Sequence, residues 1–545
     1  MENKKLLTGL WLAALVVYII GLFPEVGIDS GKYAAVSRIM FESGDWLNPQ
    51  IHGHAYLQKP HLMFWLCTIS FHLFGVSLFA FKLPTLLFTI GSVYALYKLA
   101  SLYYGSDTGK LAALIYATSE MLFLYHNDLH TDALLTANTV MGVSFLAHFL
   151  ENKKVVNFVL GFVFIGLAII TKGPIGLAVA LFALGGHLLL KKDWKMLFNP
   201  VWLLGLPILG LILSPVLYAN YKNFGWDGIE FFFWTNNAGR VTGSYNKTVD
   251  GDPSFYLHTM LYIYLPWSFY ALITIGTHIK KVINNGSNKF TRKEYFTYSV
   301  IIVYTAILSV ARQKAPHYFY PVVPYLSIVV AQFLYESITK PQKSISIKWF
   351  FGARNIMLSA LWIVVFLAIA FIFKTISLFI WVPVLGLLAV AVYFMRKSEN
   401  VYNKLIFPLV ISSIALNFVI NAHFIPAAFQ YHGGIRASAA YDKLALDDEE
   451  LFTYKFGQFE TYFYPKKISH WVNAKEELEQ VLRDSRNLWV VADREGIAEV
   501  RAMAGERIAQ EEVFKHRLIS RMSGTFLNPL TREQELESIY LLKIE

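Results

Sequence analysis

Residues 28–60, IDSGKYAAVSRIMFESGDWLNPQIHGHAYLQKP, decide how the rest of the chain is interpreted. They follow the first long apolar segment directly, yet they carry Asp29, Lys32, Arg38 and Lys59 together with two histidines. Such a mixture of charged and aromatic residues is too varied for a simple linker. We therefore expect a folded loop that supplies half of a functional site, with the other half coming from elsewhere in the chain.

The sequence around this loop has the composition of a membrane protein. Of the 545 residues, 55% are apolar and 16% are charged, whereas soluble domains carry about 25% charged residues. The apolar residues come in blocks of about 18–25, the length that spans a bilayer. The first block, 6–23, has no small-residue cleavage site after it, so we expect it to be retained as a helix. The single cysteine, Cys67, excludes an intramolecular disulfide.

Hydropathy predicts a polytopic α-helical membrane domain over residues 1–422. The loops on the side of the N-terminus are nearly all rich in lysine, which makes that side cytoplasmic and explains the net charge of +10 without a nucleic acid partner. Two long loops, 24–76 and 220–254, then lie on the outer side. The thirteen predicted spans lie near residues 6–23, 77–103, 108–126, 132–150, 155–171, 174–190, 200–219, 255–276, 296–312, 318–336, 352–373, 377–395 and 404–422.

The sequence after residue 422 changes character. Its charge density rises, and strand-like segments such as LFTYKF and NLWVVAD alternate with helix-like segments such as AKEELEQVLRDS. This pattern predicts a small soluble α/β domain over residues 423–545. The odd number of spans places it on the outer face, where it has no recognisable catalytic motif and is interpreted as a cap or an acceptor-docking module.

A few basic residues fall on the predicted outer side, where the orientation of the protein does not need them. They include Lys59, Lys172, Arg240, Arg312 and Lys314. Cations near the outer surface of a membrane are candidate ligands for an anionic group. Two alternatives are snorkelling to lipid headgroups and pairing with a neighbouring acid. For Lys59 and Arg240, which lie in the two long loops, we favour ligand binding.

Two acids accompany these cations. Asp29 lies just past the end of the first span, where a charged acid raises the free energy of the protein unless it is paired, binds a metal or takes part in function. It could form a salt bridge with Lys59. Alternatively, Lys59 holds a phosphate while Asp29 accepts a proton from an attacking group or orients it. Asp132 opens another span and could face the same cavity, after a turn whose histidines match no fixed metal-binding spacing.

The first outer loop resembles that of the GT-C glycosyltransferases, in the branch of the protein O-mannosyltransferases and the lipid A aminoarabinose transferases. The resemblance covers roughly residues 5–340 and continues through Thr171-Lys172-Gly173-Pro174 and the segment 231–240. It also includes Leu265-Pro266-Trp267 and the segment 314–318. In the first loop it rests on Asp29, Tyr33, Ser37, Arg38, Gly44, Asp45, Trp46, Pro49, Tyr56, Lys59 and Pro60.

The resemblance implies that a sugar is transferred, with inversion, from a polyprenyl-phosphate carrier to a lipid, glycan or protein acceptor. In bacteria the carrier would be undecaprenyl phosphate and the location the inner membrane. By position, Asp29 would be the essential acid near the sugar and Asp132 a second acid. The residues implied to bind the carrier phosphate are Lys59, Arg240 and Tyr318, and the further substrate-binding candidates are Lys172, Lys314 and His317.

The chain departs from the family pattern at several positions. Ser30 follows Asp29 where two adjacent acids are frequent, and Gln58 replaces the glutamate that precedes the lysine in aminoarabinose transferases. Thr235 and Asn237 stand where those enzymes have histidines. These differences weaken the case for a divalent metal and for an aminoarabinose substrate. The metal stays a hypothesis, and the sugar and acceptor stay open.

The alternative function is a transporter or flippase for an anionic lipid-linked substrate. That function predicts charged residues within the spans and an inverted internal repeat. The spans contain few charges and show no repeat. A non-catalytic scaffold is a third interpretation, but polar motifs cluster at the ends of several spans. The sequence therefore favours the enzyme.

Overall fold

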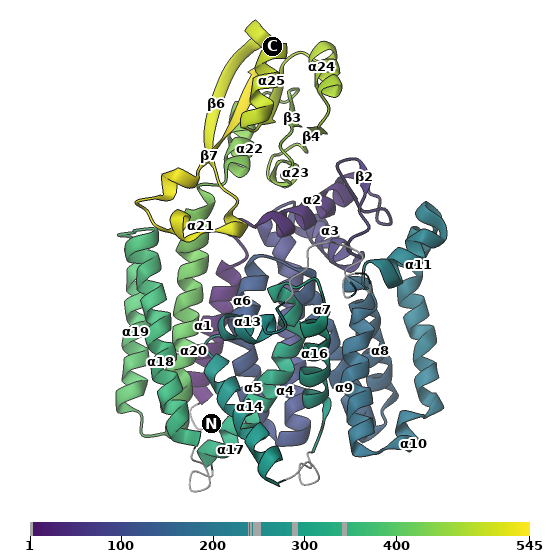
Figure 1. Cartoon of the computed structure of the whole chain (residues 1–545), viewed down its shortest axis with the longest axis vertical. Helices are drawn as coiled ribbons and strands as arrows, with labels where there is room; N and C mark the ends of the chain where they lie inside the picture. Colours follow the sequence, from purple (N-terminus) through teal and green to yellow (C-terminus); the bar gives the residue numbers. More distant parts are fainter. Residues whose placement is uncertain (1–3, 238, 240–241, 243–251, 286–292, 340–345) are drawn as a thin grey trace.

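The chain forms a long helical bundle with a small sheet domain at one end (Figure 1). The computed structural model describes residues 4–237, 239, 242, 252–285, 293–339 and 346–545. In lipid a backbone must satisfy its hydrogen bonds within its own segment, which is why the apolar blocks become helices. The main helices of the bundle are α1 (Lys4–Ile20), α4 (Leu78–Tyr104), α5 (Ser106–Ala117), α6 (Glu120–Asn127), α7 (Thr131–Asn152), α8 (Val155–Lys172), α9 (Ile175–Lys191), α11 (Gly205–Glu230), α13 (Phe255–Ile263), α14 (Ser268–Asn285), α16 (Thr305–Val310), α17 (Val323–Thr339), α18 (Ser346–Leu367), α19 (Leu378–Lys397) and α20 (Val401–Val419).

Each of the thirteen predicted spans coincides with one helix or with consecutive short helices. Two of them are divided: 108–126 between α5 and α6, and 255–276 between α13 and α14. Among the described residues, eight helices or helix runs are long and apolar enough to cross a membrane. The prediction of a polytopic helical membrane protein is therefore confirmed, while the number of crossings stays a prediction.

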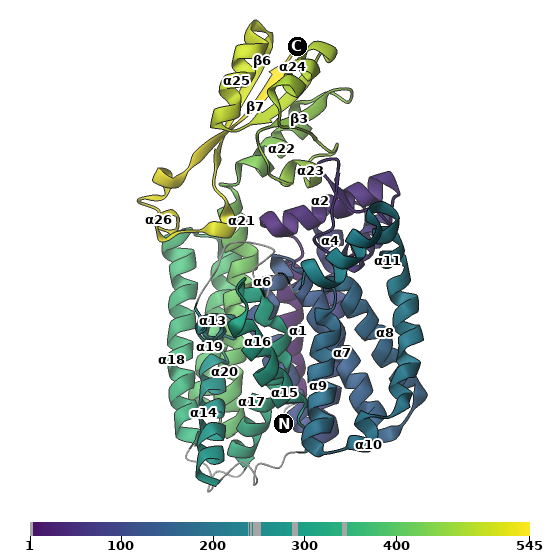
Figure 2. The same ribbon diagram turned by 45° about the vertical axis from the view of Figure 1, so that its right-hand side comes forward.

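Helix α7 lies at the centre of the bundle and is buried along most of its length. It packs against α4 and α8. Helices α18, α19 and α20 stand together on one side, and α8, α9 and α11 on the other (Figures 1 and 2). The first residues of α7 and the last residues of α8 therefore meet at the same end of the bundle. That end also carries the predicted outer loop.

The predicted outer loop 24–76 folds as two helices and a hairpin. Helix α2 (Ile28–Ser43) is followed by the short strands β1 (Gln50–Ile51) and β2 (His54–Ala55), and then by α3 (Leu62–Phe74). Figure 2 shows α2 lying across the end of the bundle, beneath the sheet domain. The sequence predicts an interface helix at 33–41 with Arg38 on its polar face. The helix is present, but Arg38 is buried, because the C-terminal domain covers that face.

The C-terminal domain is built on a five-stranded sheet with the order β4-β3-β5-β7-β6. Helix α22 packs on one face, and α24 and α25 pack on the other. The central strand β5 is buried along its whole length because helices cover both of its faces. The predicted α/β sheet domain is thus present, and its boundary at residue 423 stays a prediction. Its elements are α22 (Gly433–Leu444), β3 (Glu450–Tyr454), α23 (Glu460–Phe463), β4 (His470–Val472), α24 (Lys475–Asp484), β5 (Leu488–Ala492), α25 (Arg494–Ala504), β6 (Ile508–His516) and β7 (Glu537–Ile544).

Candidate functional site

A cavity of about 300 Å³ opens at the α2 end of the bundle. Four segments far apart in sequence form its walls, including the end of the first loop and the junction between α8 and α9. The residues that line it are Gln58, Lys59, Lys172, Pro174, Ile175, Ala178, Phe233, Trp234, Asn236, Asn237, Tyr304, Leu308, Ala311, Gln313 and Tyr318. The lining is amphipathic, with cations, amides and a phenol beside a large apolar surface.

The Lys172-Gly173-Pro174 motif forms the corner between α8 and α9. Gly173 has a φ of +78°, which a residue with a side chain rarely adopts, and its N–H donates to the carbonyl of Ile169. Pro174 fixes the entry to α9, where a missing N–H costs nothing. Because α8 ends at Lys172, the lysine side chain extends from the end of the helix into the cavity wall.

Lys172 is the centre of a partly buried charged cluster. Its Nζ donates to Oδ1 of Asp132 at 2.5 Å, and only 2% of the Asp132 side chain is exposed. The same Nζ lies 4.4 Å from the centre of the Tyr318 ring. His317 Nε2 lies 4.0 Å from the other carboxylate oxygen of Asp132. The structure therefore brings together four predicted site residues, two of which, Lys172 and Tyr318, line the cavity directly.

A histidine pair connects this cluster to the start of α2. The rings of His130 and His317 stack with their centres 4.5 Å apart, and His130 Nε2 lies 3.5 Å from Asp128. Asp128 in turn accepts a hydrogen bond from the backbone N–H of Gly27, and Ser30 donates to the carbonyl of Leu129. The turn before α7 thus fixes the first turn of α2, which contains Asp29.

Asp29 itself lies outside the cavity lining. It stands in the first turn of α2, and 54% of its side chain is exposed. Its carboxylate lies 3.7 Å from the ammonium of Lys32, one helical turn away. This ammonium also lies over the ring of Phe459, a residue of the C-terminal domain, at 5.1 Å. Of the two predicted acids, Asp132 is therefore buried beside the cavity, whereas Asp29 is exposed at the contact with the C-terminal domain.

The remaining predicted residues have different positions. Lys59 lines the cavity, and its charge acts on Asp132. Lys314 is half-buried and donates to the carbonyl of Ala311 at 2.9 Å, next to the cavity wall. Arg240 lies outside the described residues, so its proposed contact with a phosphate stays a prediction from the sequence.

Gln313 and Asn236 line the cavity but were not predicted from the sequence, which indicated mainly charged residues. The side-chain oxygen of Gln313 is buried and, in the part of the chain that the structure describes, has no hydrogen-bond partner. Asn236 donates to the carbonyl of Gln58 and so connects two walls. It follows the π-helical turn η2 (Phe231–Thr235), and such turns are frequent at functional sites. The signal available in the sequence was the run of polar residues beside Arg312 and after Trp234.

The donor set does not fit a divalent metal. Among the residues that the structure places, no three His, Cys, Asp or Glu side chains converge as metal ligands would. Asp132 is instead paired with Lys172, whose ammonium lies 2.5 Å from Oδ1. The hypothesis of a metal therefore gains no support from the described side chains, and no chemical step is assigned to one.

The sequence and the fold of this chain are similar to those of known proteins. Residues 58–218 match the family model of the dolichyl-phosphate-mannose-protein mannosyltransferases. The undecaprenyl phosphate-alpha-4-amino-4-deoxy-L-arabinose arabinosyl transferase of Yersinia enterocolitica is 27% identical over 320 residues, which cover 57% of this chain and 56% of the relative. The counterpart in Yersinia pestis is 28% identical over 314 residues, covering 56% of this chain and 54% of the relative. The match thus spans about half the length of these relatives.

The similarity of fold covers the whole chain. The crystal structure of ArnT from Cupriavidus metallidurans bound to undecaprenyl phosphate superposes with a TM-score of 0.75 and 16% identity, covering 99% of this chain and 98% of that one. The apo form of the same protein gives a TM-score of 0.73. The chain is therefore an integral membrane protein with the GT-C fold. Within that class, the predicted resemblance to the mannosyl and aminoarabinosyl transferases is confirmed.

Proposed function

We propose that this protein is a glycosyltransferase that moves a sugar from a polyprenyl-phosphate carrier to a lipid, glycan or protein acceptor. The observation that carries the proposal is the cavity, in which Lys59, Lys172 and Tyr318 stand beside an apolar surface. A molecule that joins a phosphate to a long hydrocarbon chain has the matching chemistry. The Yersinia relatives, whose names specify an undecaprenyl-phosphate donor, support the same substrate class.

The carrier would lie with its two parts in different regions of the cavity. The isoprenoid chain would contact the apolar wall formed by Ile175, Ala178 and Leu308. The phosphate would face Lys59 and Tyr318, with Lys172 held close by its pair with Asp132. Charge-assisted donors stabilise the negative charge that develops on a leaving phosphate. The cavity therefore favours departure of the carrier phosphate.

The transfer is a single displacement. An oxygen of the acceptor hydroxyl attacks C1 of the sugar from the side opposite the phosphate, and the new C1–O bond forms as the C1–O bond to the phosphate breaks. The carrier phosphate leaves with the electron pair, and the acceptor proton passes to a carboxylate. Asp29 suits this last role because it is exposed, whereas Asp132 is already bound to Lys172. The sugar is then bound to the acceptor oxygen, with inverted configuration at C1, and the carrier phosphate is released.

The orientation in the membrane is also a proposal. The described lysine-bearing loops 151–154, 191–195 and 396–404 lie at the end of the bundle where α1 begins, away from the sheet domain (Figure 1). The positive-inside rule makes that end cytoplasmic. The cavity and the C-terminal domain then face outward from the inner membrane of a bacterium. Protease digestion of a tag after residue 545 in intact spheroplasts tests this, and a protected tag would contradict it.

The activity is tested by comparing cell envelopes with and without the protein. Mass spectrometry of glycolipids and glycoproteins is expected to show one acceptor that loses the mass of one sugar when the protein is absent. The purified protein should then release polyprenyl phosphate from the matching donor in detergent. Identical envelopes together with an intact donor would contradict the proposal. No specific feature of the described residues favours the transporter alternative.

A further inference from the structure

The C-terminal domain inserts one short segment into the predicted outer loop. This docking segment, residues 459–466, contains α23 and the turn after it. Phe463 is buried in the same apolar cluster as Tyr33 and Met40 of α2. Its ring lies 6.3 Å from that of Phe71 in α3 and 5.8 Å from that of Phe81 in α4. The docking segment is therefore part of the core that α2, α3 and α4 share.

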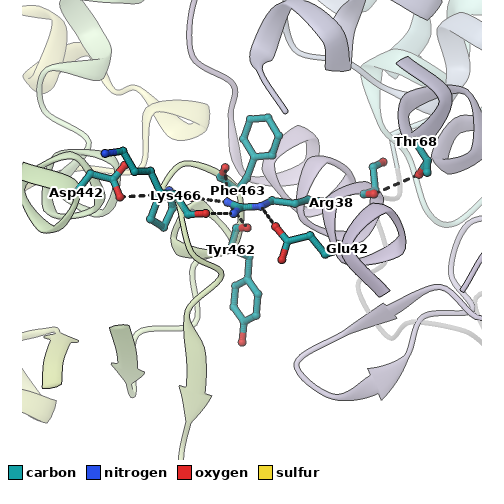
Figure 3. Close-up of polar contacts among 9 residues, drawn as sticks. Arg38, Glu42, Thr68, Asp442, Tyr462, Phe463 and Lys466 are labelled. Carbon is teal, nitrogen blue, oxygen red and sulfur yellow. Dashed lines mark hydrogen bonds and ion pairs between the residues drawn. The ribbon is translucent and has the colours of Figure 1, made fainter. Parts of the chain in front are cut away.

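Arg38 of α2 binds the backbone of this segment (Figure 3). Its Nη1 donates to the carbonyls of Tyr462 at 3.3 Å and Phe463 at 3.0 Å, and also to that of Pro465. Its Nη2 donates to the carbonyl of Lys466 at 2.6 Å. Only 3% of Arg38 is exposed. A planar guanidinium has enough fixed donors to hold several carbonyls at once, which a lysine ammonium cannot reproduce.

The charge of Arg38 is balanced within its own helix. Nε donates to Oε1 of Glu42 at 2.7 Å, so the buried cation has an acid partner one turn away. The carbonyl of Ser37 next to it accepts a hydrogen bond from Thr68 of α3. These contacts hold the C-terminal half of α2 between the bundle and the sheet domain.

The docking segment also contacts Lys32, which is the ion-pair partner of Asp29. Phe459 lies beneath the ammonium of Lys32 at 5.1 Å, and that ammonium lies 3.7 Å from Asp29. Besides the packing of Phe463, the C-terminal domain therefore contacts α2 at the guanidinium of Arg38 and at Lys32, the partner of Asp29. Arg38 follows Asp29 by nine positions, a rise of roughly 13.5 Å along a helix. One rigid helix connects the two.

We propose that Arg38 is a positioning residue, which couples the C-terminal domain through α2 to Asp29. This inference rests on the proposed function, because it assigns a consequence for sugar transfer to a contact between the two domains. The cavity residues Lys59, Lys172 and Tyr318 stand on other segments. Loss of the Arg38 contacts should therefore change the step that uses Asp29 and leave binding of the carrier intact.

The test compares Arg38→Met and Arg38→Lys with the unmodified full-length protein. A displacement of an ångström or so in a reacting group costs up to about a hundredfold in rate. We expect Arg38→Met to lower kcat at least about tenfold, with Arg38→Lys in between. The Kd for undecaprenyl phosphate should stay within about twofold because the cavity keeps its ligands. Hydrogen exchange of residues 28–43 should become faster.

The matched control is Arg483→Met, which removes an arginine of the same domain. Its side chain is 77% exposed and pairs only with Glu479 in its own helix, among the contacts of the described residues. If Arg38→Met fails to fold, Phe459→Leu replaces it, since this change removes the ring beneath Lys32 and leaves the carbonyls around Arg38 in place. Phe459→Leu should also lower kcat without weakening carrier binding.

Two results would overturn the inference. One is a kcat within about twofold of the unmodified protein for both Arg38→Met and Phe459→Leu. The other is a loss of carrier binding by the same factor as kcat, which would mean general damage to the site. If the unmodified protein transfers no sugar, the proposed function fails instead. Hydrogen exchange of residues 28–43 still shows in that case whether Arg38 fixes α2.

Discussion

Lys172 and Arg38 are both cations with little exposed surface at the α2 end of the molecule, but their surroundings differ. Lys172 has one carboxylate and one ring face as partners and lines a cavity. Arg38 donates to four backbone carbonyls and to Glu42, and it packs in a closed contact between two domains. A cation whose donors are used up by the protein holds the structure together. A cation such as Lys172, which has one carboxylate and one ring face as partners and lines a cavity, is placed to meet a ligand as well.

The largest expected effect comes from Lys172→Met. It should abolish transfer and also leave Asp132 as a buried unpaired acid, which destabilises a protein by about 3–5 kcal/mol. The double variant with Asp132→Asn should recover most of the stability and none of the activity. Thermal unfolding and the transfer assay separate the two outcomes. Recovery of transfer in the double variant would show that Lys172 serves only as a partner for Asp132.

Asp29→Asn tests whether this acid takes part in sugar transfer, although it lies at the contact between α2 and the C-terminal domain rather than in the cavity lining. General acid–base groups contribute about 10²–10⁴-fold to rate, so transfer should fall by that factor. The exposed side chain predicts a change in stability within about 0.5 kcal/mol. Measuring kcat and the unfolding midpoint on the same sample checks both. Near-normal transfer would remove Asp29 from the proposed mechanism.

Phe463→Leu weakens the packing of the C-terminal domain against α2, α3 and α4 and changes no residue that lines the cavity. The substitution keeps a large apolar side chain, so we expect a loss of about 1–1.5 kcal/mol in unfolding free energy. Binding of undecaprenyl phosphate should not change, because none of the described residues in the apolar cluster of Phe463 lines the cavity. Unfolding and binding measured together check this, with Val513→Ala as the control because that side chain is 55% exposed. Equal effects of both variants would contradict the proposed docking role.

The smallest expected effect is a pH dependence at His52. Burial, and then the positive charges of His54 and Lys32, lower the pKa of His52 to about 4 from an ordinary value of 6.5. The folded state therefore prefers neutral His52, which contacts the hydroxyl of Tyr462 at 3.0 Å. Its contribution to stability is complete above pH 6.5 and is lost as the pH falls toward 4. Unfolding midpoints between pH 7 and 4.5 should fall more steeply for the unmodified protein than for His52→Gln. Parallel pH profiles would refute the assignment.

The helices could be predicted from the sequence because the membrane imposes them locally. Every long apolar block became helical, and the Lys172-Gly173-Pro174 corner follows from the backbone preferences of glycine and proline. The breaks between α5 and α6 and between α13 and α14 could not be predicted. They depend on packing against other helices, such as the hydrogen bond from the N–H of Glu120 to the carbonyl of Leu265.

The site could be predicted only in part, for a similar reason. Charged side chains such as Asp132 and Lys172 attract attention in an apolar sequence, and the structure brings these two together. The partners of Arg38 are backbone carbonyls more than four hundred residues away, and a carbonyl has no signature in the sequence. Gln313 was missed because a neutral amide beside two cations looks like an ordinary turn residue.

The corner at Gly173 sets a fixed dimension of the cavity. A Cβ atom at this residue would lie 2.7 Å from the side-chain nitrogen of Asn237, so the end of α8 and the segment after η2 are already in contact there. Asn237 is held in turn by the carbonyl of Phe232. Gly173 has no side chain and the Asn237 amide is held by its hydrogen bond, so the two segments meet at this corner in a defined arrangement. The distance between the end of α8 and the segment after η2 is therefore set at this corner before any molecule enters the cavity.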